Sequence, residues 1–152
     1  MAYKTVLTAA AREQIRRILN DVAAEKGSLY FAMLTQTIPE VSDRWTLIVS
    51  APWVDSSGAR TIVSYLSSRL GEQLSKNALA HIDRIVPVSR TDPLVERMLT
   101  LRPRSLADPV RHFVNWRAGE IFMPEGYIFA VDPDAGTRRM VPSAANGKTA
   151  AP

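Results

Sequence analysis

The sequence contains no cysteine, which excludes a disulfide framework and every zinc site built on thiolates. It has no apolar run near the ~18 residues that a membrane-spanning helix needs. The segment before Arg12 and Glu13 is too short for the apolar region of a secretory signal. Neither GxxxxGK[ST] nor GxGxxG occurs, so the known glycine-rich phosphate loops are missing. We therefore expect a cytoplasmic protein that does not enter a membrane.

The composition is that of one folded domain. The chain has 152 residues, of which 46% are apolar and 22% are charged, a balance typical of globular proteins. Its net charge is +4, and 15 of its 19 basic residues are arginines. Arginine suits phosphate and carboxylate recognition, yet a charge of this size is also ordinary for solubility. Composition alone therefore leaves the kind of partner open.

Helical periodicity occurs in three segments. Thr8 is placed to cap the first, which Gly27 ends and whose apolar face is Ile15, Ile18, Leu19 and Val22. The second runs from Ile62 to Asn77 and contains Gly71, which weakens a helix by roughly 1 kcal/mol against alanine. The third starts at Asp92 and Pro93, a cap followed by a residue that needs no donor.

Strand patterns occupy most of the remaining chain. The segment 29–38 predicts a strand, PEVSDR a turn, and 45–49 the return strand of a hairpin. A third strand is predicted over 82–88, with Pro87 near its end because proline removes a ladder donor. We expect a last hairpin in which 120–122 and 127–131 flank MPEG.

The segment 105–117 fits two structures. Leu106, Val110, Phe113 and Val114 have helical spacing, with Ser105 and Asp108 as a capping box, whereas Val110, His112, Val114 and Trp116 alternate as in a strand. We favour a turn at RPRSLADP followed by a strand.

These elements predict an α+β fold in a single domain over 1–131. The order is helix, strand, strand, helix, strand, helix and then two or three strands, giving a mixed sheet of about five to six strands packed with two to three helices. The second and third strands should be parallel neighbours, since a helical crossover joins them. Residues 132–152 have almost no apolar anchors, so we expect a flexible tail there.

Two loops should meet at the carboxyl edge of the parallel strands, where ligands bind in open sheets. They carry candidate ligand-binding residues for a phosphate-containing small molecule: Asp55, Ser56, Ser57, Arg60, Arg90 and Asp92. Under that alternative, Asp55 and Asp92 would share a magnesium ion; otherwise we expect no metal and no cofactor. Serine and aspartate are also the commonest helix caps, and we favour that structural interpretation.

Ser57 is a poor candidate nucleophile. It needs a base, and the chain has only His81 and His112. His81 lies at the start of the third strand and Ser57 beyond the end of the second, so in parallel strands they are about 20 Å apart. His112 has no patterned acid near it in the sequence, and no nucleophile-elbow pattern occurs.

An arginine-rich segment runs from Arg97 to Arg117. Its candidate nucleic-acid-binding residues are Arg102, Arg104, Arg111, Trp116 and Arg117. No recognised nucleic-acid motif accompanies them, so we favour a solvated surface with its aromatic side chains in the core. The sequence therefore predicts first a non-catalytic module that binds a partner protein or a second copy of itself. A binder of, or enzyme acting on, a phosphate-containing molecule comes second, and nucleic-acid binding comes third.

Overall fold

The fold is α+β, with one mixed five-stranded sheet between helices. A computed structural model describes residues 7–38, 41–118 and 120–137. The helices are α1 Ala9–Lys26, α2 Pro52–Ser57, α3 Ala59–Gln73, α4 Lys76–Leu79 and α5 Pro93–Met98. The strands are β1 Phe31–Ile38, β2 Val41–Ser50, β3 Ile82–Pro87, β4 Arg111–Ala118 and β5 Ile121–Val131. No helix in these residues is both long enough and apolar enough to cross a membrane.

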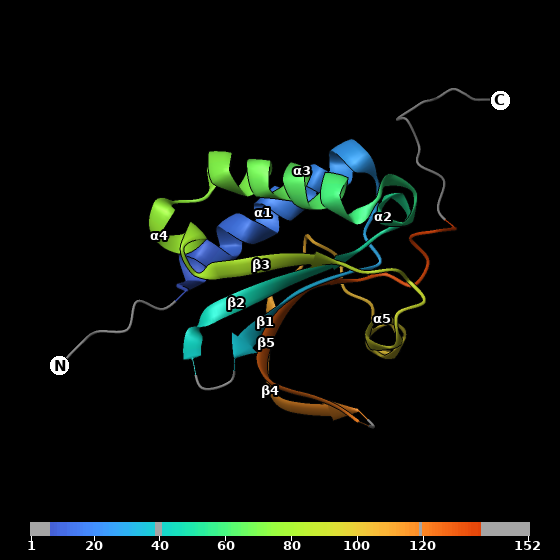
Figure 1. Cartoon of the computed structure of the whole chain (residues 1–152). Coiled ribbons are helices and arrows are strands. Elements are labelled where there is room, and N and C mark those ends of the chain that lie inside the picture. The colour runs from blue at the N-terminus through green and yellow to red at the C-terminus, as the bar shows by residue number, and fades with distance from the viewer. Residues whose placement is uncertain (1–6, 39–40, 119, 138–152) are drawn as a thin grey trace.

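The strand order is β3-β2-β1-β5-β4. Only β2 and β3 are parallel, as the helical crossover between them predicts, and the other neighbours are antiparallel. Helices α1 and α3 cover one face of the sheet, and α5 lies on the other (Figure 1). Strands β3 and β4 are the two edges.

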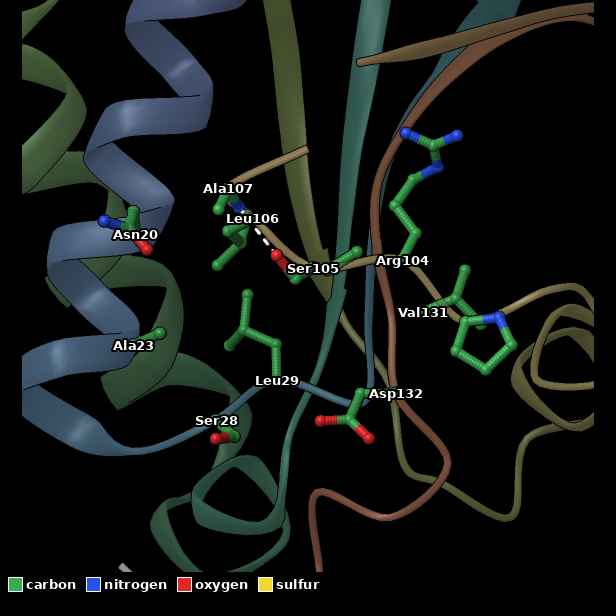
Figure 2. Close-up of a pocket in the computed structure, with 12 residues that line it drawn as sticks. Asn20, Ala23, Ser28, Leu29, Arg104, Ser105, Leu106, Ala107, Val131 and Asp132 are labelled. Atoms are coloured by element: carbon green, nitrogen blue, oxygen red, sulfur yellow. Dashed lines mark hydrogen bonds between the residues drawn. The ribbon is translucent and has the colours of Figure 1, made fainter. Parts of the chain in front are cut away.

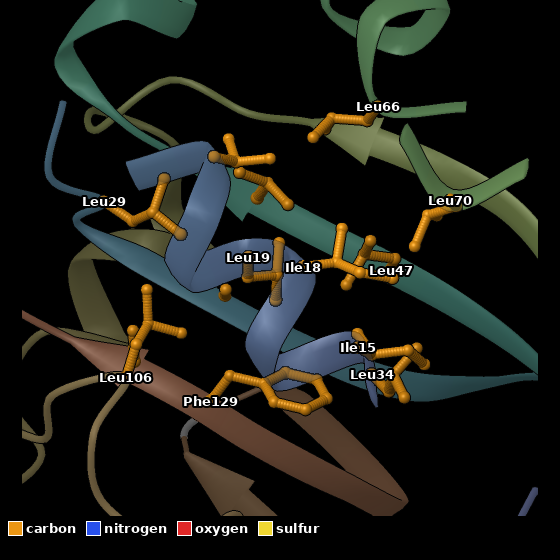
Figure 3. Close-up of a cluster of buried hydrophobic side chains, with 14 of the residues drawn as sticks. Ile15, Ile18, Leu19, Leu29, Leu34, Leu47, Leu66, Leu70, Leu106 and Phe129 are labelled. Carbon is orange, nitrogen blue, oxygen red and sulfur yellow. The ribbon is translucent and has the colours of Figure 1, made fainter. Parts of the chain in front are cut away.

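The larger core lies between the sheet and α1 and α3 (Figure 3). Ile15, Ile18 and Leu19 of α1 are buried there, as their spacing predicts. Leu66 and Leu70 reach it from α3, and Leu34, Leu47 and Phe129 from the sheet. Thr8 caps α1 by accepting a hydrogen bond from Ala11 N at 3.1 Å.

A second apolar cluster fills the opposite face. Helix α5 contributes Val95 and Met98, which pack on sheet residues such as Phe31 and Met33. Asp92 starts α5 by accepting from Leu94 N at 2.9 Å. Tyr30 also belongs to this cluster, together with Ala135 from the turn that follows β5.

The strand assignment for the ambiguous segment is confirmed, because β4 begins at Arg111. Ser105 and Asp108, proposed above as a capping box, instead close the turn before it: Ser105 N donates to Asp108 Oδ2 at 2.9 Å. The predicted tail starts with a hydrogen-bonded turn over 132–137, in which Asp132 N donates to Tyr30 O. The rest of the tail, 138–152, lies outside the described residues.

The predicted hairpin around MPEG is wrong. β5 runs unbroken from Ile121 to Val131, and its hairpin partner is β4. Gly126 serves close packing, since a Cβ on it would lie 2.3 Å from Phe113 Cζ and 2.7 Å from Leu34 O. The part of β5 that precedes Gly126, residues 121–125, does not pair with β1 and has only β4 as a neighbour, so the missing donor of Pro124 is tolerated.

Smaller boundaries also differ from the predictions. β2 begins at Val41, so most of PEVSDR is strand, and β1 begins at Phe31. The second long helix ends at Gln73, after which Ser75 caps the separate short α4 by accepting from Ala78 N. α2 was not predicted, and it starts with Pro52 at its first turn.

Candidate functional site

The two loops predicted to form an anion site begin at the same edge of the sheet. Val49 of β2 pairs with Pro87 of β3, so the parallel strands end side by side. The segment after β2 enters α2 and α3, and the segment after β3 enters α5. The common starting edge is therefore as the sequence predicts.

The loops then separate toward opposite faces of the sheet. Val54 of α2 and Ile62 of α3 pack in the core shared with α1, whereas Val95 of α5 packs in the cluster on the other face. Figure 1 shows α2 and α5 on opposite sides of the sheet. Within the described part of the chain, no hydrogen bond or ion pair joins 51–60 to 89–92.

The candidate residues of the first loop point to no shared centre. Asp55, Ser56, Ser57 and Arg60 are all exposed. The Ser56 hydroxyl is within 3.2 Å of Trp53 O, a local contact within α2. Gly58, between the two helices, has φ 83° and so occupies a conformation that favours glycine.

The candidate residues of the second loop have structural contacts. The Asp92 carboxylate caps α5, and Ser89 Oγ lies 3.1 Å from Thr91 Oγ1. The Arg90 guanidinium carbon lies 5.4 Å from the centre of the Tyr30 ring, a cation–π arrangement. Among the described residues, no three His, Cys, Asp or Glu side chains are grouped so that they could hold a metal ion.

Neither histidine is placed to activate Ser57. His81 precedes β3, and its carbonyl accepts from Trp45 N at 2.9 Å. Ser57 follows the opposite end of β2, where Val49 pairs with Pro87, so the length of the strands separates the two residues. His112 lies on β4, the other edge of the sheet, where Nε2 is 2.8 Å from Glu125 Oε2.

The proposed nucleic-acid residues are dispersed. Arg102 is exposed in the loop before β4, and Arg104 is half-buried and donates to Pro109 O. Arg111 and Arg117 are exposed at opposite ends of β4. Trp116 packs against the second apolar cluster, so its ring is turned to the core.

The β4–β5 hairpin has an irregular centre. Asn115 has φ 51° and lies between the pairs Val114–Glu125 and Trp116–Met123. Alternate residues of a regular strand share a face, so Phe113 and Trp116, three apart, would point to opposite faces. Both nevertheless pack against the second cluster. The backbone at Asn115 therefore changes which side chains of the hairpin face outward.

Two large apolar side chains are left on the outside of this hairpin. Val114 is 58% exposed and Phe122 is 45% exposed, and no other large hydrophobic side chain of the described residues is exposed to this degree. Arg117 lies over Phe122, with the guanidinium carbon 4.8 Å from the ring centre. We call Val114, Arg117 and Phe122 the hairpin patch. The sequence interpretation missed both apolar members, because strict alternation predicts a different outward face.

A polar and aromatic group borders this patch. The His112 ring stacks on Tyr127 with centroids 4.7 Å apart, and Arg12 of α1 lies 4.2 Å above the same ring. Burial raises the pKa of the Tyr127 hydroxyl above its ordinary value of 10.0, which Arg12 opposes and Glu125 reinforces. Gln36 Nε2 donates to Glu125 at 3.4 Å. These contacts fix β5 and the first half of β4 against α1.

A separate cavity of about 370 Å³ lies beside the second half of α1 (Figure 2). Its walls are α1, the start of the chain into β1, the segment 103–107 and the end of β5. Of all the candidate residues named from the sequence, only Arg104 lines it.

A scan against models of protein families matched none of them. Searches of curated proteins and of solved structures likewise found no significant similarity to this chain. The function must therefore be inferred from these surfaces.

Proposed function

We propose that this chain is a non-catalytic binding module that contacts a partner protein through the hairpin patch. The observation that carries the proposal is the pair of exposed apolar side chains, Val114 and Phe122, on one hairpin at the edge of the sheet. Contiguous exposed apolar surface rimmed by polar side chains is typical of interaction sites, whereas single exposed apolar side chains are ordinary. The lack of cysteine fits a module that acts in the reducing cytosol.

The charge of the patch favours an acidic partner segment. Arg111 and Arg117 are exposed on β4, while the nearby carboxylate of Glu125 is engaged by His112. An acidic segment with an apolar anchor that lies along the β4 edge would meet Arg117 where it covers Val114 or Phe122, and would reach Arg111 at the other end of the strand. Charged groups at the rim of an interface guide association, and buried apolar anchors supply most of the affinity.

A second copy of the chain fits this edge less well. In an antiparallel β4–β4 pair centred on Val114, Arg111 would face Arg117 of the other copy, because each is three residues from the centre. Like charges directly opposite destabilise strand pairs. Charges and an irregular backbone such as that at Asn115 also protect edges from self-pairing. We therefore favour a different protein as the partner.

A peptide-display selection tests the proposal. A library of random peptides of about 12 residues is selected on the protein and, in parallel, on the double variant Val114→Ser, Phe122→Ser. We expect acidic peptides with an apolar residue to be enriched on the unchanged protein alone. Peptides that bind the double variant equally well would contradict the proposal.

A charge variant with a matched control completes the test. Arg111→Gln with Arg117→Gln should weaken the enriched peptides about tenfold or more, whereas Arg60→Gln with Arg84→Gln removes the same charge elsewhere and should not. All four arginines are exposed. Light scattering over a range of concentrations tests whether the partner is a second copy of this chain. A dimer that is lost in the Val114→Ser, Phe122→Ser variant would show that the hairpin patch binds a second copy and not a different protein.

A further inference from the structure

The cavity beside α1 has an apolar floor. Leu29 and Leu106 line it and are buried, as are Ala130 and Val131 at the end of β5. Its volume of about 370 Å³ is at the lower end of the range of small-molecule sites, which begins near 300 Å³. An apolar floor of this size suits the hydrocarbon part of a small molecule.

The cavity wall formed by 103–107 is held in place by hydrogen bonds. Arg104 and Val131 exchange both backbone bonds, at 2.8 and 2.9 Å. The Arg16 guanidinium donates to Leu106 O from α1, and it also pairs with Glu13. Ala107 N donates to Ser105 Oγ at 2.9 Å. The cavity is therefore preformed, as ligand sites usually are.

The charges around the cavity disfavour an anion. Among the described residues that line the cavity, the only cation is Arg104. It donates to Pro109 O, and Figure 2 shows its guanidinium turned away from the other labelled side chains. The Asp132 carboxylate is turned toward Ser28 and Leu29 (Figure 2). Asp132 Oδ1 accepts from Asp134 N at 3.0 Å. A carboxylate has about four acceptor sites, so it can accept from a ligand as well as from its protein partners.

The rest of the rim offers hydrogen-bonding groups without charge. Asn20 of α1 and Ser28 before β1 are exposed and line the cavity. Ser105 Oγ accepts from Ala107 N, which leaves its own proton available to donate. Together with the Asp132 carboxylate, which only accepts, the Asn20 amide oxygen and the serine hydroxyls give the rim more acceptor sites than donors. Such a rim above an apolar floor favours a ligand that carries donors at the ends of a short hydrocarbon chain.

We propose that this cavity is a binding site for a small neutral or cationic molecule with hydroxyl or ammonium donors on a short hydrocarbon chain. The site is distinct from the hairpin patch, and no residue belongs to both. Anions are disfavoured because the Asp132 carboxylate repels them and because Arg104, the one cation among the described residues that line the cavity, points away from it.

Three probes that share a four-carbon chain test the charge preference: butanediol, putrescine and succinate. They end in hydroxyl, ammonium and carboxylate groups respectively. In NMR titrations of the isotope-labelled full chain, butanediol and putrescine should shift the amide signals of Leu29, Ala107 and Ala130. For six to eight non-hydrogen atoms, a dissociation constant of the order of 1–10 mM is expected. The dissociation constant of succinate, measured from the same signals, should be at least about tenfold higher.

Variants of the rim locate the binding. Ala107→Phe fills the cavity from an exposed position and should abolish the shifts at Leu29 and Ala130. Asp132→Asn keeps an acceptor for Asp134 N and should weaken putrescine more than butanediol. The matched control Asp134→Asn, on the same turn but outside the cavity, should change neither. Equal binding of succinate, shifts that persist in a folded Ala107→Phe variant, an Asp132→Asn variant that binds putrescine and butanediol as the unchanged protein does, or no shift with either donor probe would each overturn the proposal.

Discussion

Gly126 of β5 lies directly against the ring of Phe113 on β4, so close that a Cβ at this position would be 2.3 Å from Phe113 Cζ. The same Cβ would be 2.7 Å from Leu34 O in β1. Ring and backbone both block the added atom, and the backbone oxygen cannot move without disturbing the sheet. The lack of a side chain at Gly126 therefore permits the close packing of β1, β4 and β5 at this point.

Replacing Gly126 by alanine should destabilise the protein by about 2 kcal/mol or more, through overpacking. The control is Gly71→Ala on the exposed surface of α3, where an added Cβ meets nothing within 4 Å. That change should stabilise the protein by about 0.5–1 kcal/mol, since alanine is the better helix former. Urea unfolding measures both, and a neutral Gly126→Ala variant would refute the described packing.

The Ser50 hydroxyl gives a second prediction, because Ser50 is fully buried and its Oγ has no hydrogen-bond partner among the residues that the structure describes. A buried hydroxyl without a partner costs free energy. Ser50→Ala should therefore raise the free energy of unfolding by about 1 kcal/mol. Thr8→Ala removes a hydroxyl that caps α1 by accepting from Ala11 N, and should lower the free energy of unfolding by about 1 kcal/mol. Equal signs for the two variants in urea unfolding would be inconsistent with the structure.

Two tyrosines should make the protein less stable in alkali. Burial raises the pKa of both Tyr127 and Tyr65, and the hydrogen bond from Tyr65 to Glu25 adds to the effect. A raised pKa in the folded state means that stability is complete below the unfolded pKa of about 10 and is lost as pH rises through the folded pKa.

Tyr127→Phe should therefore reduce the loss of stability above about pH 10 and leave its pH dependence below about pH 9 unchanged. Tyr65→Phe should reduce the alkaline loss as well. Urea unfolding at several pH values measures the effect, and absorbance near 295 nm follows phenolate formation. Variants that lose stability above pH 10 as steeply as the unchanged protein would contradict this.

Variants of Asp92 and Asp55 distinguish two interpretations of the predicted anion site, one in which these residues have a structural role and one in which they bind a ligand. Asp92 caps α5, so Asp92→Ala should cost about 1 kcal/mol. Asp55 is exposed, and Asp55→Ala should stay within about 0.5 kcal/mol. Thermal unfolding with and without Mg²⁺ and phosphate tests the alternative. If these ions stabilise the unchanged protein and neither variant is stabilised, the two loops form an anion site, contrary to the structural interpretation.

Local pattern predicted the frame of this fold. The spacing of Ile15, Ile18 and Leu19 predicted α1, and the helical crossover predicted the parallel pairing of β2 with β3, since these signals depend on residues near one another in the chain. Proline and glycine usually mark turns, which is why the sequence predicts a turn at MPEG, and that prediction is wrong. Here Gly126 accommodates Phe113 and Leu34, contacts that are distant in sequence.

The candidate sites were harder to predict for the same reason. The common edge of the loops after β2 and β3 followed from strand direction, but the sequence does not state that α3 and α5 cover opposite faces. In a regular strand Val114 and Trp116 would share a face. The left-handed backbone at Asn115, which no period-two pattern reveals, turns Trp116 to the second cluster while Val114 stays exposed. The cavity residues come from four separate segments, so no local motif unites them.

The most direct test of the proposed function is an NMR map of an enriched acidic peptide on the labelled protein. The account predicts shifts concentrated in 111–117 and 120–125, and an affinity that falls about tenfold or more in the Val114→Ser, Phe122→Ser variant. Shifts concentrated on the helical face of α1 and α3, with an affinity unchanged by that variant, would contradict it.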